Sequence, residues 1–380
     1  MPLSTVLKTN KIISDMRKFF LIAIAILLGC ASDVDAQSIT VIDTDSVPVA
    51  YATVTNEQGQ LIGATNVNGI LDDTKGNGVL CFSHVAYKPI TVNVADLTDG
   101  VVIMEEERYT LPSVEVKPKE LLYMQTYYRV TYIDEEGPIY YRAGVIDNTY
   151  EFANRKVKTK STNISEGQSG FLKFVLNKIA GGMIEDICKI QKESTYQLVG
   201  SNNGKWAKVS VAVDSTGRKV IRDSESILGY VDEDMEEGKR ITSFDNWLFR
   251  KHLDIAKEKN EKKKQKKQTE LDKEQENSER SYYEVYRIDE EGRSTISDFV
   301  MMQHLSKGVF KRTKKEYILV LESFATETAY IDKKEFKQTR KDNEVDKSYE
   351  DMLRYEKAHN IPPLAPHLKA QVEKLFEKKK

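Results

Sequence analysis

The stretch Leu80-Cys81-Phe82-Ser83-His84-Val85-Ala86-Tyr87 decides the fold of the first part of the chain. Apolar and polar residues alternate along it, which is typical of a strand with one buried face, and Lys88-Pro89 closes it. Two stretches of the same kind, residues 48–54 and 90–94, flank it and run into turns rich in Asn, Asp or Gly. Short strands at such spacing predict a small antiparallel β-sandwich over residues 38–116.

The motifs in this segment resemble those of the carboxypeptidase-regulatory-like family, a prealbumin-type β-sandwich common in exported proteins of Bacteroidetes. The matching segments are the strand at 41–43, the P-x-x-x-A-x-V strand at 48–54, the Gly-rich turn at 63–69, the L-x-F-S-x-x-G-Y strand at 80–87 and the closing segment at 111–116. Ala86 replaces the usual glycine, Asn66 the common Asp, and Ile70-Leu71 an aromatic-bearing pair. The resemblance covers residues 37–117 of 380 and implies a scaffold or docking module there.

An export signal precedes the sandwich, at residues 1–36. Arg17-Lys18 is followed by the apolar run 19–28, which is too short to span a bilayer and suits a signal peptide. Translation is expected to start at Met16. Small residues before Gln37 predict cleavage after Ala36, while a lipobox-like sequence leaves lipidation of Cys30 as the alternative. Either route predicts an exported protein, in the periplasm or at the outer membrane.

The amino-acid composition of the chain limits the classes of partner that it can bind. The chain has 57 Lys and Arg residues against 59 Asp and Glu residues, a net charge of −2. Such a balance argues against a nucleic-acid binder, which needs a concentrated basic face. Beyond the N-terminal segment no stretch is apolar for long enough to span a bilayer, so no transmembrane span is expected in the mature chain.

Residues 118–337 are expected to form an α+β domain with a curved antiparallel sheet. The segments 127–137 and 282–292 each read as a Tyr-rich strand that runs into Asp-Glu-Glu-Gly, either an internal duplication or two independent hairpins. Further strands are expected at 139–141, 206–213, 219–221, 317–321 and 328–331. The apolar residues of 172–188 recur at helical spacing and predict a helix packed on this sheet.

The remaining segments are charged or helical. Residues 257–280 mix Lys and Glu without an apolar face, which predicts a solvated, dispensable insert. The tail 338–380 contains two predicted helices, 346–359 and 368–376, divided by a Pro-rich segment. The overall fold class is therefore mainly β / α+β.

No catalytic motif is recognisable. A zinc carboxypeptidase needs a His-x-x-Glu pair and a distant His, yet no histidine of the five is followed three residues later by Glu. Nucleophile-elbow, Walker and dinucleotide motifs are likewise not found, so no catalytic residue, metal or cofactor is expected. Cys81 and Cys188 can be two buried thiols or a disulfide, and the sequence leaves their pairing open.

The sequence thus predicts a non-enzymatic cell-envelope protein in which a sandwich docking module is joined to a domain that binds a ligand or partner. The partner is expected to be another envelope protein or a hydrophobic or glycan ligand. The alternative is a hydrolase whose catalytic groups are scattered through the second domain. A fragment of an outer-membrane transporter is excluded because the chain after the sandwich is too short for its barrel, which needs about 22 strands of about ten residues.

Overall fold

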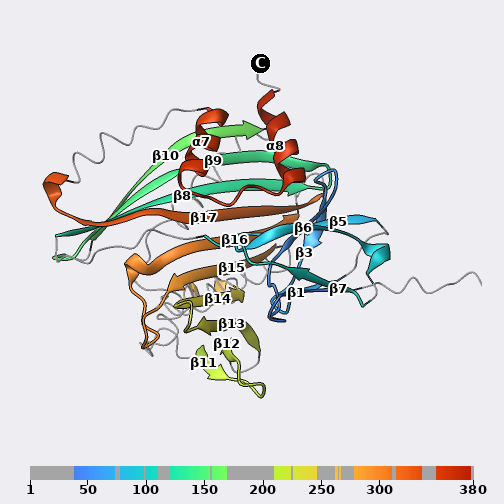
Figure 1. Ribbon diagram of the computed structural model, residues 1–380, viewed down its shortest axis with the longest axis horizontal. Coiled ribbons are helices and arrows are strands. Elements are labelled where there is room, and N and C mark those ends of the chain that lie inside the picture. The colour runs from blue at the N-terminus through green and yellow to red at the C-terminus, as the bar shows by residue number, and fades with distance from the viewer. Residues whose placement is uncertain are drawn as a thin grey trace, which may run out of the picture. The chain divides into compact units, whose positions relative to one another are not determined.

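Strands make up most of the described residues, with short strands before residue 105 and mostly longer ones after residue 120 (Figure 1). The computed structural model describes residues 38–72, 78–97, 99–109, 120–154, 156–168, 209–223, 226–245, 262–263, 265–266, 278–309, 314–335 and 348–377. The processing residues Cys30, Ala36 and Gln37, the predicted helix at 172–188 with Cys188, and most of the insert lie outside these ranges.

The short strands form a sandwich of two sheets. One sheet has the order β4-β1-β7 and the other β3-β2-β5-β6. Their bounds are β1 Ile39–Asp43, β2 Thr53–Asn56, β3 Leu61–Ala64, β4 Ile70–Leu71, β5 Val79–His84, β6 Tyr87–Asn93 and β7 Val101–Met104, with the 3-10 turn η1 at Val94–Asp96. The expected sandwich is present, but it is not wholly antiparallel: β1 pairs in parallel with β7, from Thr40 opposite Val101 to Asp43 opposite Met104.

Two predicted strands of the sandwich have different bounds in the structure. The stretch 80–87 is a hairpin, because Val85 and Ala86 form a turn between β5 and β6. Pro89 therefore lies inside β6, where it is tolerated because β6 is an edge strand. Of the predicted strand at 48–54 only the end belongs to β2, since the chain at Tyr51 adopts a left-handed conformation with φ 64° that no strand allows.

The strands after residue 120 form one antiparallel sheet of ten, in the order β10-β9-β8-β17-β16-β15-β14-β13-β12-β11 (Figure 1). Two meanders build it, and they join where β17 pairs with β8. The bounds are β8 Leu121–Asp134, β9 Gly137–Glu151, β10 Lys156–Gln168, β11 Ser210–Val213, β12 Lys219–Arg222, β13 Ile227–Asp234, β14 Lys239–Asp245, β15 Ser278–Arg287, β16 Phe299–Val309 and β17 Glu316–Ile331, with the 3-10 turn η2 at Ile296–Asp298.

The sheet uses strands from both sides of the charged insert, and two predicted boundaries are wrong. The strands expected at 317–321 and 328–331 are one strand, β17, with a register shift between Ala325 and Glu327. The insert was expected to run to Arg280, but β15 begins at Ser278, which pairs with Gly308. Residues 278–280 belong to a strand because they pair with β16, although their composition resembles that of the insert.

Two C-terminal helices, α7 at Tyr349–Ala358 and α8 at Pro366–Glu377, pack on β9 and β10. The Ser348 side chain accepts a hydrogen bond from the Asp351 amide and caps α7. Pro366 starts α8 two residues before the predicted helix, at a first-turn position that tolerates proline. In the described part of the chain no helix has the length and apolarity needed to cross a membrane.

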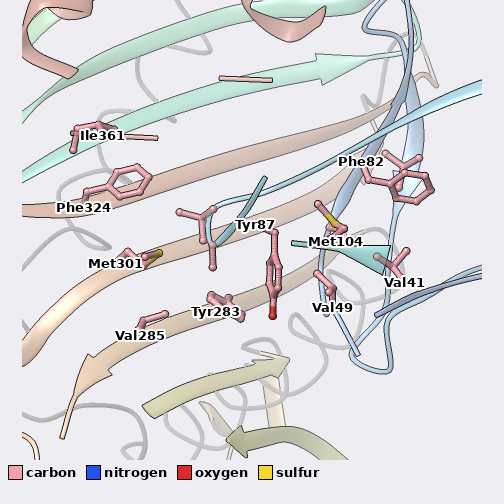
Figure 2. Packing of buried hydrophobic residues seen from close by; sticks show 14 of the residues in the cluster. Val41, Val49, Phe82, Tyr87, Met104, Tyr283, Val285, Met301, Phe324 and Ile361 are labelled. Carbon is pink, nitrogen blue, oxygen red and sulfur yellow. The ribbon is translucent and has the colours of Figure 1, made fainter. Parts of the chain in front are cut away.

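One buried apolar cluster connects these parts. It includes Val41, Phe82 and Met104 of the sandwich, Tyr283, Val285, Met301 and Phe324 of the sheet, and Met352, Val372 and Leu375 of the helices. Figure 2 shows Tyr87 of the sandwich among side chains of the sheet strands. An isolated sandwich would expose its part of this shared core to water.

A candidate ligand pocket between the sandwich and the sheet

The Gln303 side chain of β16 connects the sheet to two loops of the sandwich. Its Nε2 atom donates to the carbonyl oxygen of Tyr51 at 2.9 Å, and its Oε1 atom accepts from the Val85 amide at 3.0 Å. Gln303 is 2% exposed, so both hydrogen bonds are made out of contact with water. These bonds fix where the sandwich loops lie above strands β14 to β16.

A cavity of about 530 Å³ lies beside this contact, and we call it the junction pocket. Its volume falls in the range of small-molecule sites, roughly 300–1,000 Å³. The sandwich contributes Tyr51, residues 62–67, Ile70, Leu71 and Asp72 to its wall. The large sheet contributes Ile227, Leu228, Asp245, Arg280, Ser281, Leu305, Lys307 and Glu316.

The floor of the pocket follows from strand register. Asp245 lies opposite Ser281, and Ser281 lies opposite Leu305, across β14, β15 and β16. Residues directly opposite one another in neighbouring strands share a face of the sheet. An acid, a hydroxyl and an apolar side chain therefore form a row on the face that meets the sandwich.

Tyr51 is the unusual residue of the pocket. A positive φ of 64° is rare for a bulky residue and costs about 1–3 kcal/mol. The backbone around it is held from several sides: its amide donates to the Thr65 carbonyl at 3.2 Å, and the Thr65 hydroxyl donates to the Val49 carbonyl at 2.8 Å. The Gln303 bond completes the set, so the surrounding contacts offset the strain.

The Tyr51 hydroxyl has no hydrogen-bond partner among the described residues, although the side chain is only 7% exposed. A buried hydroxyl without a partner costs about 1–3 kcal/mol. Burial, and then the negative charge of Asp245, raise the pKa of Tyr51 well above its ordinary value. The phenol is therefore neutral at physiological pH, and none of the described residues accepts a hydrogen bond from it.

A second polar cluster lies beneath the C-terminal helices. Arg129, which is 2% exposed, contacts Glu322 at 2.5 Å and Glu356 at 3.4 Å, and it donates to the Pro362 carbonyl at 2.7 Å. Tyr127 donates to Glu356 at 2.7 Å. The two carboxylates outweigh burial and raise the pKa of Arg129, which stays charged. These groups satisfy one another, so the cluster holds the tail to the sheet, and the cavity of about 30 Å³ that Arg129 and Glu322 line has room for little more than a water molecule.

An acidic cleft of about 370 Å³ lies where the loop after β1 meets β13 and β14. Its carboxylates are mostly engaged: Asp232 forms two hydrogen bonds with Arg218, Glu233 pairs with Arg240, and Glu106 pairs with Lys239. In the described ranges no three His, Cys, Asp or Glu side chains are placed to hold a metal ion. The cleft is thus a set of ion pairs between strands.

Two of the histidines on which a hydrolase would depend are buried and make separate contacts in the described structure. Burial lowers the pKa of His84 to about 3, and its ring packs edge-on against Tyr283 at 4.4 Å. Burial lowers the pKa of His367 to about 4, and its Nε2 atom lies 2.7 Å from the Thr55 hydroxyl. Cys81 is buried as a free thiol beside the Thr91 hydroxyl.

The sequence did not single out Tyr51. It lies in a segment that reads as an ordinary strand, and neither Gly nor Asn marks the left-handed position. The other half of the pocket comes from strands more than 170 residues further along the chain. Only the three-dimensional fold brings these groups together.

Comparisons with known proteins leave the family open. No family model matches the chain, and no curated protein matches it. A solved structure described as "Lipid-protein interactions in lipovitellin" aligns with 56% of this chain and 26% of its own, with 8% identity and a TM-score of 0.23. The alignment thus spans about a quarter of that protein's length, and a similarity of this size carries no argument about fold or function.

Proposed function

We propose that this protein is a non-enzymatic binding protein of the cell envelope, in which the sandwich and the large sheet together form the ligand site at the junction pocket. The sequence-based expectation placed the sandwich as a docking module and ligand binding in the second domain. The pocket supports a combined role, because its wall is divided between the two.

The observation that carries the proposal is the Tyr51 hydroxyl, which is buried without a partner among the described residues, at a cavity large enough for a small molecule. The strained backbone of Tyr51 adds a second unfavourable contribution to the free energy of folding. Such features cluster at ligand and active sites, where they are part of the function. A bound ligand that accepts a hydrogen bond from this phenol would recover the cost of its burial.

The test uses the neutral apolar dye N-phenyl-1-naphthylamine, whose fluorescence rises when it leaves water. The mature wild-type protein should bind it saturably. Ala64→Phe places a ring in the pocket and should abolish binding, and Ile227→Asp should weaken it at least tenfold by adding a charge to an apolar position that is 42% exposed.

The matched control is Tyr140→Phe, a conservative change at a fully buried residue of β9 that does not line the pocket. It should leave dye affinity unchanged. Because Ile227 is exposed, its variant should keep the wild-type melting temperature and so separates lost binding from lost folding. Equal dye affinity in the wild type and both pocket variants would refute the proposed site.

A further inference from the structure

We propose that the junction pocket takes an uncharged amphiphile that carries a hydroxyl group, with the hydroxyl held between Tyr51 and Asp245. This inference rests on the binding role proposed above and deepens it by naming the class of ligand. It follows from three properties of the pocket wall: the pairing of a donor with an acceptor, the balance of charge, and the position of the apolar residues.

The donor and the acceptor belong to different parts of the chain. Tyr51 of the sandwich is neutral, so its hydroxyl donates a proton. Asp245 at the end of β14 lines the same pocket and acts electrostatically on Tyr51. An ionised carboxylate is only an acceptor and has about four lone-pair sites, so it can accept from a ligand as well as from the protein.

A ligand hydroxyl satisfies both groups at once, since it accepts from Tyr51 and donates to Asp245. A ligand carboxylate could accept from Tyr51 but would be repelled by Asp245. A ligand ammonium could approach Asp245 but has no acceptor for the Tyr51 proton. Neither charged head group satisfies both groups of the protein.

The charge of the whole wall points the same way. Its cationic side chains are Arg280 and Lys307, and its acidic ones are Asp72, Asp245 and Glu316. These opposing charges give a small excess of negative charge, so an anion gains no net attraction. Since Asp72 is exposed, water and salt also screen its contribution.

The apolar residues of the wall favour an apolar body for the ligand. Leu71, Leu228 and Leu305 are buried at the pocket, at 2%, 2% and 4% exposure. Ile227 carries the apolar surface out to solvent. Burying an alkyl chain against such a surface stabilises the complex by about 0.8 kcal/mol for each CH₂ group. An amphiphile with an alkyl tail and a hydroxyl-bearing head matches this wall.

Three compounds with the same octyl tail test the head group by displacing N-phenyl-1-naphthylamine from the full mature protein, each below its micelle concentration. They are octyl glucoside, octanoate and octyltrimethylammonium. Octyl glucoside should displace the dye at a concentration at least tenfold lower than either charged compound. A fourth compound, 1-octanol, separates the two sources of this chemistry: a value equal to that of the glucoside indicates a simple alcohol, and a weaker value indicates a glycan head.

Two variants test the hydrogen bonds. Tyr51→Phe and Asp245→Asn should each weaken octyl glucoside by about 3- to 10-fold relative to the dye measured on the same variant, which is the value of one hydrogen bond. Tyr51→Phe should also raise the melting temperature of the free protein, because it removes an unpaired buried hydroxyl. Tyr140→Phe, which removes a buried hydroxyl outside the pocket, should leave the affinities for octyl glucoside and for the dye unchanged.

Equal or better displacement by octanoate or octyltrimethylammonium would overturn the inference, as would full octyl glucoside affinity in Tyr51→Phe. In both cases the proposed binding role would still stand if the wild type binds the dye and Ala64→Phe does not. Absence of saturable dye binding by the wild type would contradict the binding role as well as the class of ligand.

Discussion

Gln303 of the large sheet donates a hydrogen bond of 2.9 Å to the backbone carbonyl of Tyr51, the residue at which the sandwich is most strained. The same side chain accepts from the Val85 amide in the turn between β5 and β6. A single buried amide therefore fixes two sandwich loops against β16. The position of the Tyr51 hydroxyl in the junction pocket depends on this contact.

Gln303→Leu should destabilise the protein by about 2–4 kcal/mol, because it leaves a buried carbonyl and a buried amide without partners. Urea unfolding of the mature protein measures the change. The same substitution at the exposed Gln58 should change the free energy of unfolding by less than about 0.5 kcal/mol. Equal effects at the two positions would mean that the Gln303 contact contributes nothing to stability.

Arg129→Leu should cost about 3–5 kcal/mol, because it leaves Glu322 and Glu356 buried without their counterion. Replacing all three residues by Leu should recover most of this loss, since the cost arises from unpaired buried charge. The exposed pair of Arg293 and Asp289 is the matched control, and Arg293→Leu should cost less than about 1 kcal/mol. A triple variant less stable than Arg129→Leu would contradict this account.

The free energy of unfolding should decrease as pH falls, because His84 is buried in its neutral form. Its folded pKa of about 3 lies below the ordinary 6.5, so the unfolded chain binds more protons between these values. The stabilising contribution is complete above pH 6.5 and is lost as pH falls, with a slope of about 1.4 kcal/mol per pH unit. His84→Asn keeps an acceptor for the Ala86 amide and should reduce the slope by that amount.

His367 has the same sign of shift, and buried carboxylates add slopes of their own. Comparing wild type with His84→Asn isolates one residue because the other groups are common to both. Denaturant titrations from pH 4 to pH 7 give the two curves. Parallel curves would show that His84 is protonated in the folded protein at these pH values.

Replacing residues 257–277 with a short Gly/Ser linker should leave the melting temperature nearly unchanged, because the segment has no apolar face to bury. A replacement that extends to residue 280 should lower it, since it also removes the first three residues of β15, which pair with β16. Differential scanning calorimetry of the two variants gives the comparison. Equal melting temperatures would show that this end of β15 adds no stability.

The mature protein should begin at Gln37, as the segment before it has the pattern of a cleaved signal peptide. Mass spectrometry of the N-terminal peptide from native cells measures this directly. A diacylated peptide that starts at Cys30 would show instead that the protein is tethered to a membrane. Ala36→Arg should block ordinary cleavage, whereas Cys30→Ser should have no effect.

The sequence predicts those parts of the fold that depend on local pattern. Alternating apolar residues located the strands of the sandwich, and the Tyr-rich segments located β8 and β15. The sequence did not predict the bounds of those elements that tertiary contacts determine. Composition does not show that Ser278 belongs to a strand, because its ladder partner Gly308 supplies the reason. The alternation in residues 80–87 continues through a tight turn, so it conceals the hairpin.

The candidate site was beyond sequence reasoning for a related reason. Tyr51 has an ordinary neighbourhood in the chain, and its unusual backbone is imposed by Thr65 and Gln303. Asp245 lies at a strand end and reads as a turn residue. The donor and the acceptor are 194 positions apart, and only the pairing of sheet and sandwich places them on one cavity.

The parallel pairing of β1 with β7 has a mechanical consequence. Because the two strands run in the same direction, the chain enters β1 at one end of the pair and leaves β7 at the other. A pulling force between the start of the sandwich and the rest of the protein is then directed along the strands. It loads the hydrogen bonds from Thr40 to Met104 in shear, so that they share the force and must break together. The pair therefore resists extension along the chain better than an antiparallel hairpin pulled apart at its open end, whose hydrogen bonds break one after another.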